Sequence, residues 1–445
     1  MRSGKRWITA GLCCLILLIG SHPPILAEDR AKSFAQDLAA AKRAGIPTTP
    51  QELQAPLPPP NQNAAPLYLE IDKILKEHPL DKDDKILASG AYRAMPSAEQ
   101  FERMRRALKH RSELVALARK ATLRPQYGVL RDWTNPFQVL SREVGGIRYG
   151  ARFLATESLL MAHDGKPLEA VRSQALGFTL ATHATEEQFL LGYLTSHTVN
   201  GITLSGLQKI LYVSGSDVKV AESVQSVVEK AYVEPILRKA LQHEAGVDIA
   251  ILRYLRKNGA AAFKDLSALD LSQALSFMPP QKMNAFLDDN GSILLKYVQR
   301  LMTVADSPYP KADSVFRAVQ AEYEKDKDPM HTLTLILFQA YPQNDERQAR
   351  LQAMVEVTRA GAFALSWKAR HGAFPEKLDG ASSPKFVDPF DGKPLRYRRE
   401  GAGFVVYSVG ATGKFTGGTP DQKAGNETRF RYPAPSEFTL PLREK

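Results

Sequence analysis

The sequence predicts a mainly α-helical protein, in which a helical bundle or irregular α-solenoid body precedes one long helix and a small antiparallel β segment. Two observations lead to this prediction. Over residues 67–340, and again over 345–369, apolar residues recur three or four positions apart, as on a helix with one buried face. Between residues 395 and 409 the period changes to two, which is the period of a strand. We therefore divide the folded chain into a body at 67–343 and a domain at 344–445.

The first 27 residues have the pattern of a secretory signal peptide. Three basic residues precede an uncharged run of 14 residues from Trp7 to Gly20, and small residues lead to Ala27. This run is shorter than the roughly 20 residues that a membrane-spanning helix needs. We expect cleavage after Ala27, a periplasmic or secreted mature chain, and no membrane span after cleavage. A lipoprotein acylated at Cys13 or Cys14 and an uncleaved N-terminal anchor are the alternatives.

Composition excludes some classes of chemistry and partner. Both cysteines lie in the predicted signal peptide, so the mature chain would have neither a disulfide nor a cysteine nucleophile. Loss of residues 1–27, which contain three basic residues and no acidic one, would lower the net charge from +11 to +8. A charge of this size can attract anionic surfaces. The scatter of the lysines and arginines along the chain, however, favours solvated helix faces over a basic binding surface. Basic runs with interleaved aromatic residues are missing, so we expect no nucleic-acid partner.

Residues 28–66 are predicted as an N-terminal segment with a short helix near 29–44 and a proline-rich linker. The stretch 46–66 contains seven prolines, and Pro58–Pro60 fixes three successive φ angles. Such a stretch is extended and semi-rigid. It is either a tether to the folded body or an arm packed along it.

The body is predicted as consecutive antiparallel helices. Ser97 and Thr185 each begin a capping-box pattern, which is typical of a helix start. The sequence Asp164-Gly165-Lys166-Pro167 separates two amphipathic segments and predicts an αα-hairpin. No repeat of about 34 residues is present, so a tetratricopeptide array is not indicated. Further helices are expected near 217–243, 246–257, 281–304 and 312–324.

The long helix after the body has the clearest boundaries. Asn344 or Asp345 can cap its start, and His371 and Gly372 supply a polar last residue and a glycine suited to a left-handed C-cap. Residues 395–398 and 404–409 are then predicted as the strands of a hairpin. Because an isolated two-stranded hairpin is only marginally stable, we expect the long helix to cover its apolar face.

Residues 345–420 resemble the C-terminal half of the major pseudopilins of type II secretion systems. They contain a helix ending in HGAFPEKL, a loop DPFDGKPLRYR and a strand FVVYSVG that is followed by glycines. The resemblance implies a pseudopilin-like α+β domain with an extended tail at 344–445, and the whole chain looks like a large exported bacterial protein carrying that domain. A fold is not an activity, so the resemblance is specific for fold and weak for function. The fold-signature residues are Gly372, Pro375, Asp388, Pro389, Phe390, Gly392, Tyr397, Tyr407, Ser408 and Gly410.

The chain departs from the pseudopilin pattern in two ways. Pseudopilins open with a prepilin signal and a hydrophobic assembly helix, whereas this chain opens with the pattern of an ordinary secretory signal. In the family, the loop after the strand binds calcium through carboxylates, and Thr412 stands at the acidic position here. We therefore expect no calcium between Gly410 and Gly418.

The sequence contains no motif that indicates a reaction. The nine histidines are dispersed, and zinc-protease, paired-carboxylate, phosphate-loop and serine-hydrolase motifs are missing. We expect no catalytic, cofactor-binding or metal-binding residues. The sequence thus favours an exported, non-enzymatic envelope protein with a helical body that binds a protein partner and a pseudopilin-like docking domain, in association with secretion. The alternative is a periplasmic enzyme that acts on an acidic or polysaccharide substrate in a cleft of the body.

Overall fold

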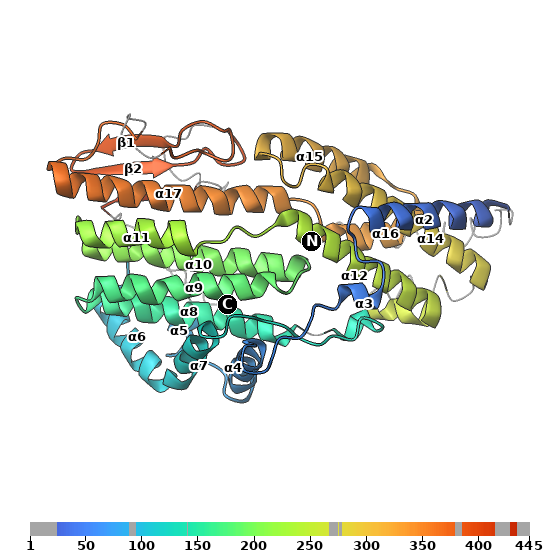
Figure 1. Ribbon diagram of the computed structural model, residues 1–445, viewed down its shortest axis with the longest axis horizontal. Helices are drawn as coiled ribbons and strands as arrows, with labels where there is room; N and C mark the ends of the chain where they lie inside the picture. The colour runs from blue at the N-terminus through green and yellow to red at the C-terminus, as the bar shows by residue number, and fades with distance from the viewer. Residues whose placement is uncertain are drawn as a thin grey trace.

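Helices form most of the protein, and a three-stranded antiparallel sheet lies near its C-terminus (Figure 1). The predicted mainly helical fold with a small antiparallel β segment is confirmed. In the part of the chain that the structure describes, no helix combines the length and the apolar character needed to cross a membrane. The first 24 residues, which include most of the predicted signal peptide, lie outside the described part. The computed structural model describes residues 25–88, 95–139, 141–266, 275, 278–378, 385–413 and 428–433.

The helices form two groups, which Figure 1 shows side by side. One group is a stack that runs from α4–α7 through α8, α9, α10 and α11 to α17, with the sheet on the far side of α17. The stack contains α4 (Ala65–Glu77), α5 (Lys85–Ala88), α6 (Ala98–His110), α7 (Ser112–Thr122), α8 (Arg142–His163), α9 (Pro167–Thr185), α10 (Leu190–Ser214), α11 (Val218–Ala231) and α17 (Asn344–His371). The second group contains α2 (Ile25–Arg43), α12 (Leu237–Asn258), α14 (Pro280–Met302), α15 (Tyr309–Lys325) and α16 (Thr332–Leu337).

The predicted αα-hairpin is formed by α8 and α9. Gly165 in the turn between them has a φ of +80°, a conformation that suits glycine because it has no Cβ. The next pair, α9 and α10, approaches closely at Gly177, where a Cβ would lie 2.1 Å from Thr203 Oγ1. Small residues at this crossing therefore set the spacing of the stack.

The N-terminal segment is packed on the body. Helix α2 lies along α14, and the Phe34 ring occupies the space above Gly291, where a Cβ would lie 2.4 Å from it. The short helix α3 (Pro50–Leu53) follows and begins with a capping box, in which Thr49 Oγ1 accepts a hydrogen bond from Glu52 N. The buried side chain of Leu53 then anchors the segment next to α12.

The proline-rich stretch after α3 is an arm packed along the body, and it does not form a free tether. Gln54 Nε2 donates to Val129 O (3.2 Å), and its Oε1 accepts from Arg131 N (2.9 Å). Asn63 pairs with Gly128 in the same way, at 2.8 and 3.1 Å. These two side-chain amides satisfy backbone groups of the loop after α7, as a neighbouring strand would.

Helix α17 joins the C-terminal segment to the body. In Figure 1 it lies between α11 and the sheet. A single hydrophobic core contains Val220 and Val224 of α11, Leu365 of α17, and Phe404 and Phe430 of the sheet. The start of α17 therefore marks a new helix inside a shared core.

The sheet has the order β1-β2-β3, and both of its pairings are antiparallel. Val406 of the central strand lies opposite Tyr397 on one side and Phe430 on the other. The two predicted strands are confirmed with shifted ends, whereas the third strand was not predicted. The strands are β1 (Arg396–Glu400), β2 (Gly403–Tyr407) and β3 (Arg429–Tyr432).

Two predicted helix ends agree with the structure. Ser97 Oγ accepts from Gln100 N, and Gln100 Oε1 accepts from Ser97 N, which completes the predicted capping box of α6. Gly372 follows the last residue of α17 with a φ of +78°, and its N–H donates to Lys368 O. The predicted left-handed C-cap is therefore confirmed.

Other predicted helix boundaries are wrong. Neither Asn344 nor Asp345 caps α17, because both lie inside the helix and its N-cap, Gln343, makes no side-chain cap. The predicted helix at 217–243 is broken between Ala231 and Leu237, because Pro235 has no N–H to donate within a helix. Thr185 ends α9, whereas the capping-box pattern predicted that it starts the next helix. Helix α10 instead follows Phe189, which makes no side-chain cap.

The packing of α17 against the sheet predicts opposite effects for two glycine substitutions. A Cβ on Gly361 would lie 2.5 Å from the Phe430 ring, so Gly361→Ala should destabilise the fold by about 1–3 kcal/mol through overpacking. Gly201 of α10 has open space around its Cβ position, so Gly201→Ala should stabilise the fold by about 0.5–1 kcal/mol. Urea unfolding of both variants measures the difference. Equal effects would contradict the close approach of the sheet.

Candidate functional site

The fold-signature residues meet around the buried carboxylate of Asp388. Its Oδ1 accepts hydrogen bonds from Phe390 N (3.1 Å) and Ser408 Oγ (2.9 Å). Its Oδ2 accepts from Val409 N (2.8 Å) and Arg396 Nη1 (3.2 Å). One carboxylate therefore holds the DPFDGK turn against the end of β2.

Other signature residues attach this turn to its surroundings. The Phe390 ring packs edge-to-face against Tyr309 of α15, with ring centroids 4.8 Å apart. The Tyr397 hydroxyl donates to Pro375 O at 2.8 Å. The remaining signature residues have comparable structural positions: Gly372, Gly392 and Gly410 have positive φ angles, Pro389 lies within the turn, and Tyr407 is buried in β2.

These contacts give the signature a structural role. Its polar atoms are used in hydrogen bonds within the C-terminal segment, and its rings are used in packing. The loop from Gly410 to Gly418, for which we expect no calcium, lies mostly outside the described residues.

Because four donors surround the Asp388 carboxylate, we predict that its replacement by an amide strongly lowers the stability of the fold. Asp388→Asn places an NH₂ group among donors and should destabilise the fold by about 2–4 kcal/mol. Asp391→Asn is the matched control, because that carboxylate is partly exposed and pairs mainly with Arg396, so its loss should cost under about 1 kcal/mol. Chemical unfolding of the two variants tests this difference. A loss of stability in Asp388→Asn as small as that in Asp391→Asn would contradict the role of Asp388 in holding the turn against β2.

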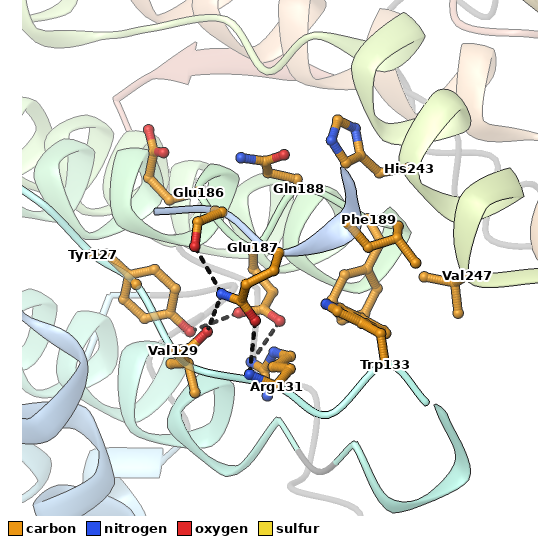
Figure 2. Close-up of a pocket in the computed structure, with 14 residues that line it drawn as sticks. Tyr127, Val129, Arg131, Trp133, Glu186, Glu187, Gln188, Phe189, His243 and Val247 are labelled. Atoms are coloured by element: carbon orange, nitrogen blue, oxygen red, sulfur yellow. Dashed lines mark hydrogen bonds and ion pairs between the residues drawn. The ribbon is translucent and has the colours of Figure 1, made fainter. Parts of the chain in front are cut away.

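A recess lies where the arm, the loop after α7, the α9–α10 turn and α12 meet (Figure 2). Figure 2 shows Tyr127 and Trp133 on opposite sides, with Arg131 and Glu187 between them. The arm contributes residues 53–55 to the wall, and α12 contributes His243. Because the arm is tied to the loop by the Gln54 amide, four separate chain segments hold the recess in shape.

A buried ionic network forms one side of the recess. The Arg131 guanidinium pairs with the carboxylates of Glu143 and Glu187, and its Nη2 lies 2.5 Å from Glu187 Oε1. The Tyr127 hydroxyl donates to Glu187 Oε2 (2.9 Å) and lies 3.2 Å from Glu143 Oε1. The three charged side chains are at most 6% exposed, so water screens them weakly.

The network leaves the recess with an excess of negative charge. Burial, followed by the charges of Glu187 and Glu143, raises the pKa of Tyr127 above its ordinary value, so it remains a neutral donor. Burial alone would lower the pKa of Arg131, but the two carboxylates raise it, so this residue stays a cation. One cation therefore faces two buried carboxylates. Burial also lowers the pKa of His243, which is neutral at pH 7.

The recess is small. It encloses about 30 Å³, which is room for one or two water-sized groups. Pockets for small-molecule ligands usually have volumes of roughly 300–1,000 Å³. The arrangement can therefore hold one compact polar group, and it has no room for a sugar ring.

A second pair of acids, of which Asp248 is buried and Glu244 is partly buried, lies next to the recess on α12. Glu244 and Asp248 are one turn apart; Glu244 Oε2 accepts from Leu190 N (3.0 Å), and Asp248 Oδ2 accepts from the Tyr341 hydroxyl (2.5 Å). Burial raises the pKa of Glu244 to about 7. Burial and the neighbouring Glu244 raise the pKa of Asp248 as well. The pair therefore holds protons at a pH at which an exposed carboxylate has lost them.

This pair predicts a stability that depends on pH. Because the folded-state pKa of Glu244 is raised, its contribution is fully present below the ordinary carboxyl pKa and is lost as pH rises through about 7. The free energy of unfolding should therefore fall between about pH 5 and pH 8. Glu244→Gln keeps an acceptor for Leu190 N and should flatten this dependence. Urea unfolding at several pH values measures it, and an unchanged slope in Glu244→Gln would contradict the assignment.

A third cluster of polar residues is accounted for by ion pairing. Asp81, Asp84 and His110 lie close enough together to offer a metal three ligand atoms. The buried Asp84 carboxylate, however, already accepts from Arg111 Nε at 2.5 Å and lies 3.1 Å from His110 Nδ1. A guanidinium at this distance supplies the positive charge that a metal would bring, so the cluster does not fit a cation.

Sequence reasoning missed the recess. The aromatic character of Trp133 favours a position in the core, and this residue is almost fully buried. Glu187 lies within the capping-box pattern that begins at Thr185, but its carboxylate pairs with Arg131. The available signal for the recess was Glu187 itself, a glutamate between a helix end and a run of apolar residues. Its partners at 131 and 143, however, lie on other elements, so the sequence alone does not connect them.

Comparison of the chain with protein-family models, with curated protein sequences and with solved structures found no match. The pseudopilin resemblance therefore remains a prediction from the residues of the C-terminal segment.

Proposed function

We propose that the chain is an exported, non-enzymatic protein of the bacterial cell envelope. In this proposal the helical body is a scaffold that binds a protein partner, and the pseudopilin-like C-terminal segment docks to components associated with secretion. The signal-peptide pattern supports export, and the ordered set of signature residues from 372 to 410 supports the docking role.

The geometry of the recess is the observation that most favours binding over catalysis. Its two buried carboxylates both pair with Arg131, which fixes their position. A general acid or a nucleophile must be free to bond directly to the substrate. Both carboxylates already bond to the Arg131 guanidinium, and Glu187 also accepts from the Tyr127 hydroxyl, so neither is free for such a step, although their charge still acts across the recess.

The alternative is a periplasmic enzyme for an acidic or polysaccharide substrate, and the paired carboxylates are the observation in its favour. The excess negative charge of the recess opposes an acidic substrate, because like charges repel strongly where water is excluded. Its enclosed volume of about 30 Å³ opposes a sugar unit. The scaffold proposal is therefore preferred.

The proposal predicts processing and a protein partner. A C-terminally tagged protein in its native cell should be recovered from the envelope with an N-terminus at Glu28, and crosslinking should join it to an envelope protein. N-terminal sequencing and mass spectrometry of the crosslinked material measure both. Substitution of the apolar run 7–20 by polar residues is the control that should keep the protein in the cytoplasm. Recovery of the unprocessed chain from the cytoplasm would refute export, and turnover of envelope polymers would favour the enzyme.

A further inference from the structure

The recess has aromatic walls as well as negative charge. The rings of Trp133 and Phe189 meet edge-to-face, with centroids 5.8 Å apart. Trp133 packs with Leu53 of α3 and Ala250 of α12. Aromatic rings beside carboxylates favour an organic cation, because the ring faces are electron-rich and the cation's methylene groups lose contact with water.

The acceptors of the recess are also arranged for a donor. Glu186, Gln188 and His243 lie along its rim in Figure 2. His243 Nδ1 lies 3.0 Å from Lys239 O and must donate to this carbonyl, which leaves Nε2 as an acceptor. Among the described residues that line the recess, Arg131 supplies the sole arginine or lysine side chain, and the two glutamates already neutralise it.

Size distinguishes between the two common organic cations of proteins. The enclosed space of about 30 Å³ fits a compact ammonium group, which is close in size to a water molecule. A planar guanidinium is larger and would require movement of the arm or of the α9–α10 turn.

We propose that the recess is a binding site for the ammonium group of a lysine side chain on the protein partner. The lysine stem would lie against Trp133 and Phe189, and its ammonium would face Glu187 and the rim. This inference rests on the proposed function, since it names the chemistry by which the scaffold recognises its partner.

The test uses n-butylammonium as a probe for the lysine side chain. The chain has three tryptophans, so Trp7→Phe and Trp367→Phe together leave Trp133 as the only tryptophan, whose fluorescence can be excited apart from that of the tyrosines. The probe should change Trp133 fluorescence saturably in the millimolar range and more weakly at high salt. n-Butanol, the neutral isostere, should give no saturable change, and n-butylguanidinium should bind at least about threefold more weakly because of its size.

Substitution of single glutamates by glutamine tests which carboxylates contribute to n-butylammonium binding. Glu187→Gln should weaken n-butylammonium binding about tenfold, and Glu186→Gln at the exposed rim should weaken it about twofold. Glu113→Gln, an exposed glutamate in the first turn of α7, is the matched control and should change nothing. Circular dichroism checks that each variant is folded. If Glu187→Gln is not folded, Glu186→Gln and the salt dependence still test the site.

The possible outcomes separate this inference from the proposed function. Equal responses to n-butylammonium and n-butanol, or no saturable response to either, would overturn the lysine site even if a partner copurifies with the chain. Saturable, glutamate-dependent binding would support the site even if no partner is recovered, and only the proposed function would then fail. Binding of n-butylguanidinium as tight as that of n-butylammonium would overturn the assignment to lysine.

Discussion

The burial of α17 between the helical stack and the sheet is the constraint on which the rest of the structure depends. A helix that packs on both sides needs small residues where its neighbours come close, and Gly361 supplies one beside the sheet. Ala360, the residue before it, is buried in the same core. The stack can use α17 as its last layer because the sheet covers the far side of this helix (Figure 1). The C-terminal segment thereby completes a core that the earlier helices leave open.

The structural motif and the proposed binding site lie in different parts of the chain. The residues from 372 to 410 form the most recognisable pattern of the sequence, and their atoms are used to fold the turn around Asp388 and to fix it on α15. The recess near Trp133 is formed by residues that belong to no functional motif of the sequence. Its charge is a consequence of the fold, since two glutamates from α8 and the α9–α10 turn meet one arginine of a loop.

Local signals in the sequence predicted much of the fold. Ser97, Gly165 and Gly372 act within a few residues of their own positions, so a cap or a left-handed turn could be inferred from the chain alone. Pro235 is also a local signal, but the apolar residues on both sides of it keep a helical spacing. This spacing predicted one continuous helix where α11 and α12 are separate. The third strand follows residues of mixed character and could not be distinguished from a loop. Its buried apolar residue, Phe430, packs against Gly361 of α17, which is remote in the sequence.

The recess could not be predicted, for a different reason. Arg131, Glu143 and Glu187 are separated by 12 and 44 positions in the sequence, and no spacing rule connects a loop, a helix start and a helix end. The arm that closes the recess was ambiguous as well. Prolines make a stretch extended, but the Gln54 and Asn63 amides determine whether it packs, and their partners at 128–131 are remote.

Equilibrium urea unfolding observed separately at two tryptophans tests most directly whether the C-terminal segment and the body share one core. Trp367 lies on α17 and stacks on His371, whereas Trp133 lies beside the recess. With Trp7 replaced, Trp133→Phe and Trp367→Phe variants each leave one reporter. A shared core predicts that both reporters unfold with the same midpoint and the same slope. Earlier unfolding at Trp367, with Trp133 still native, would show that the C-terminal segment is an independent domain and would contradict this account.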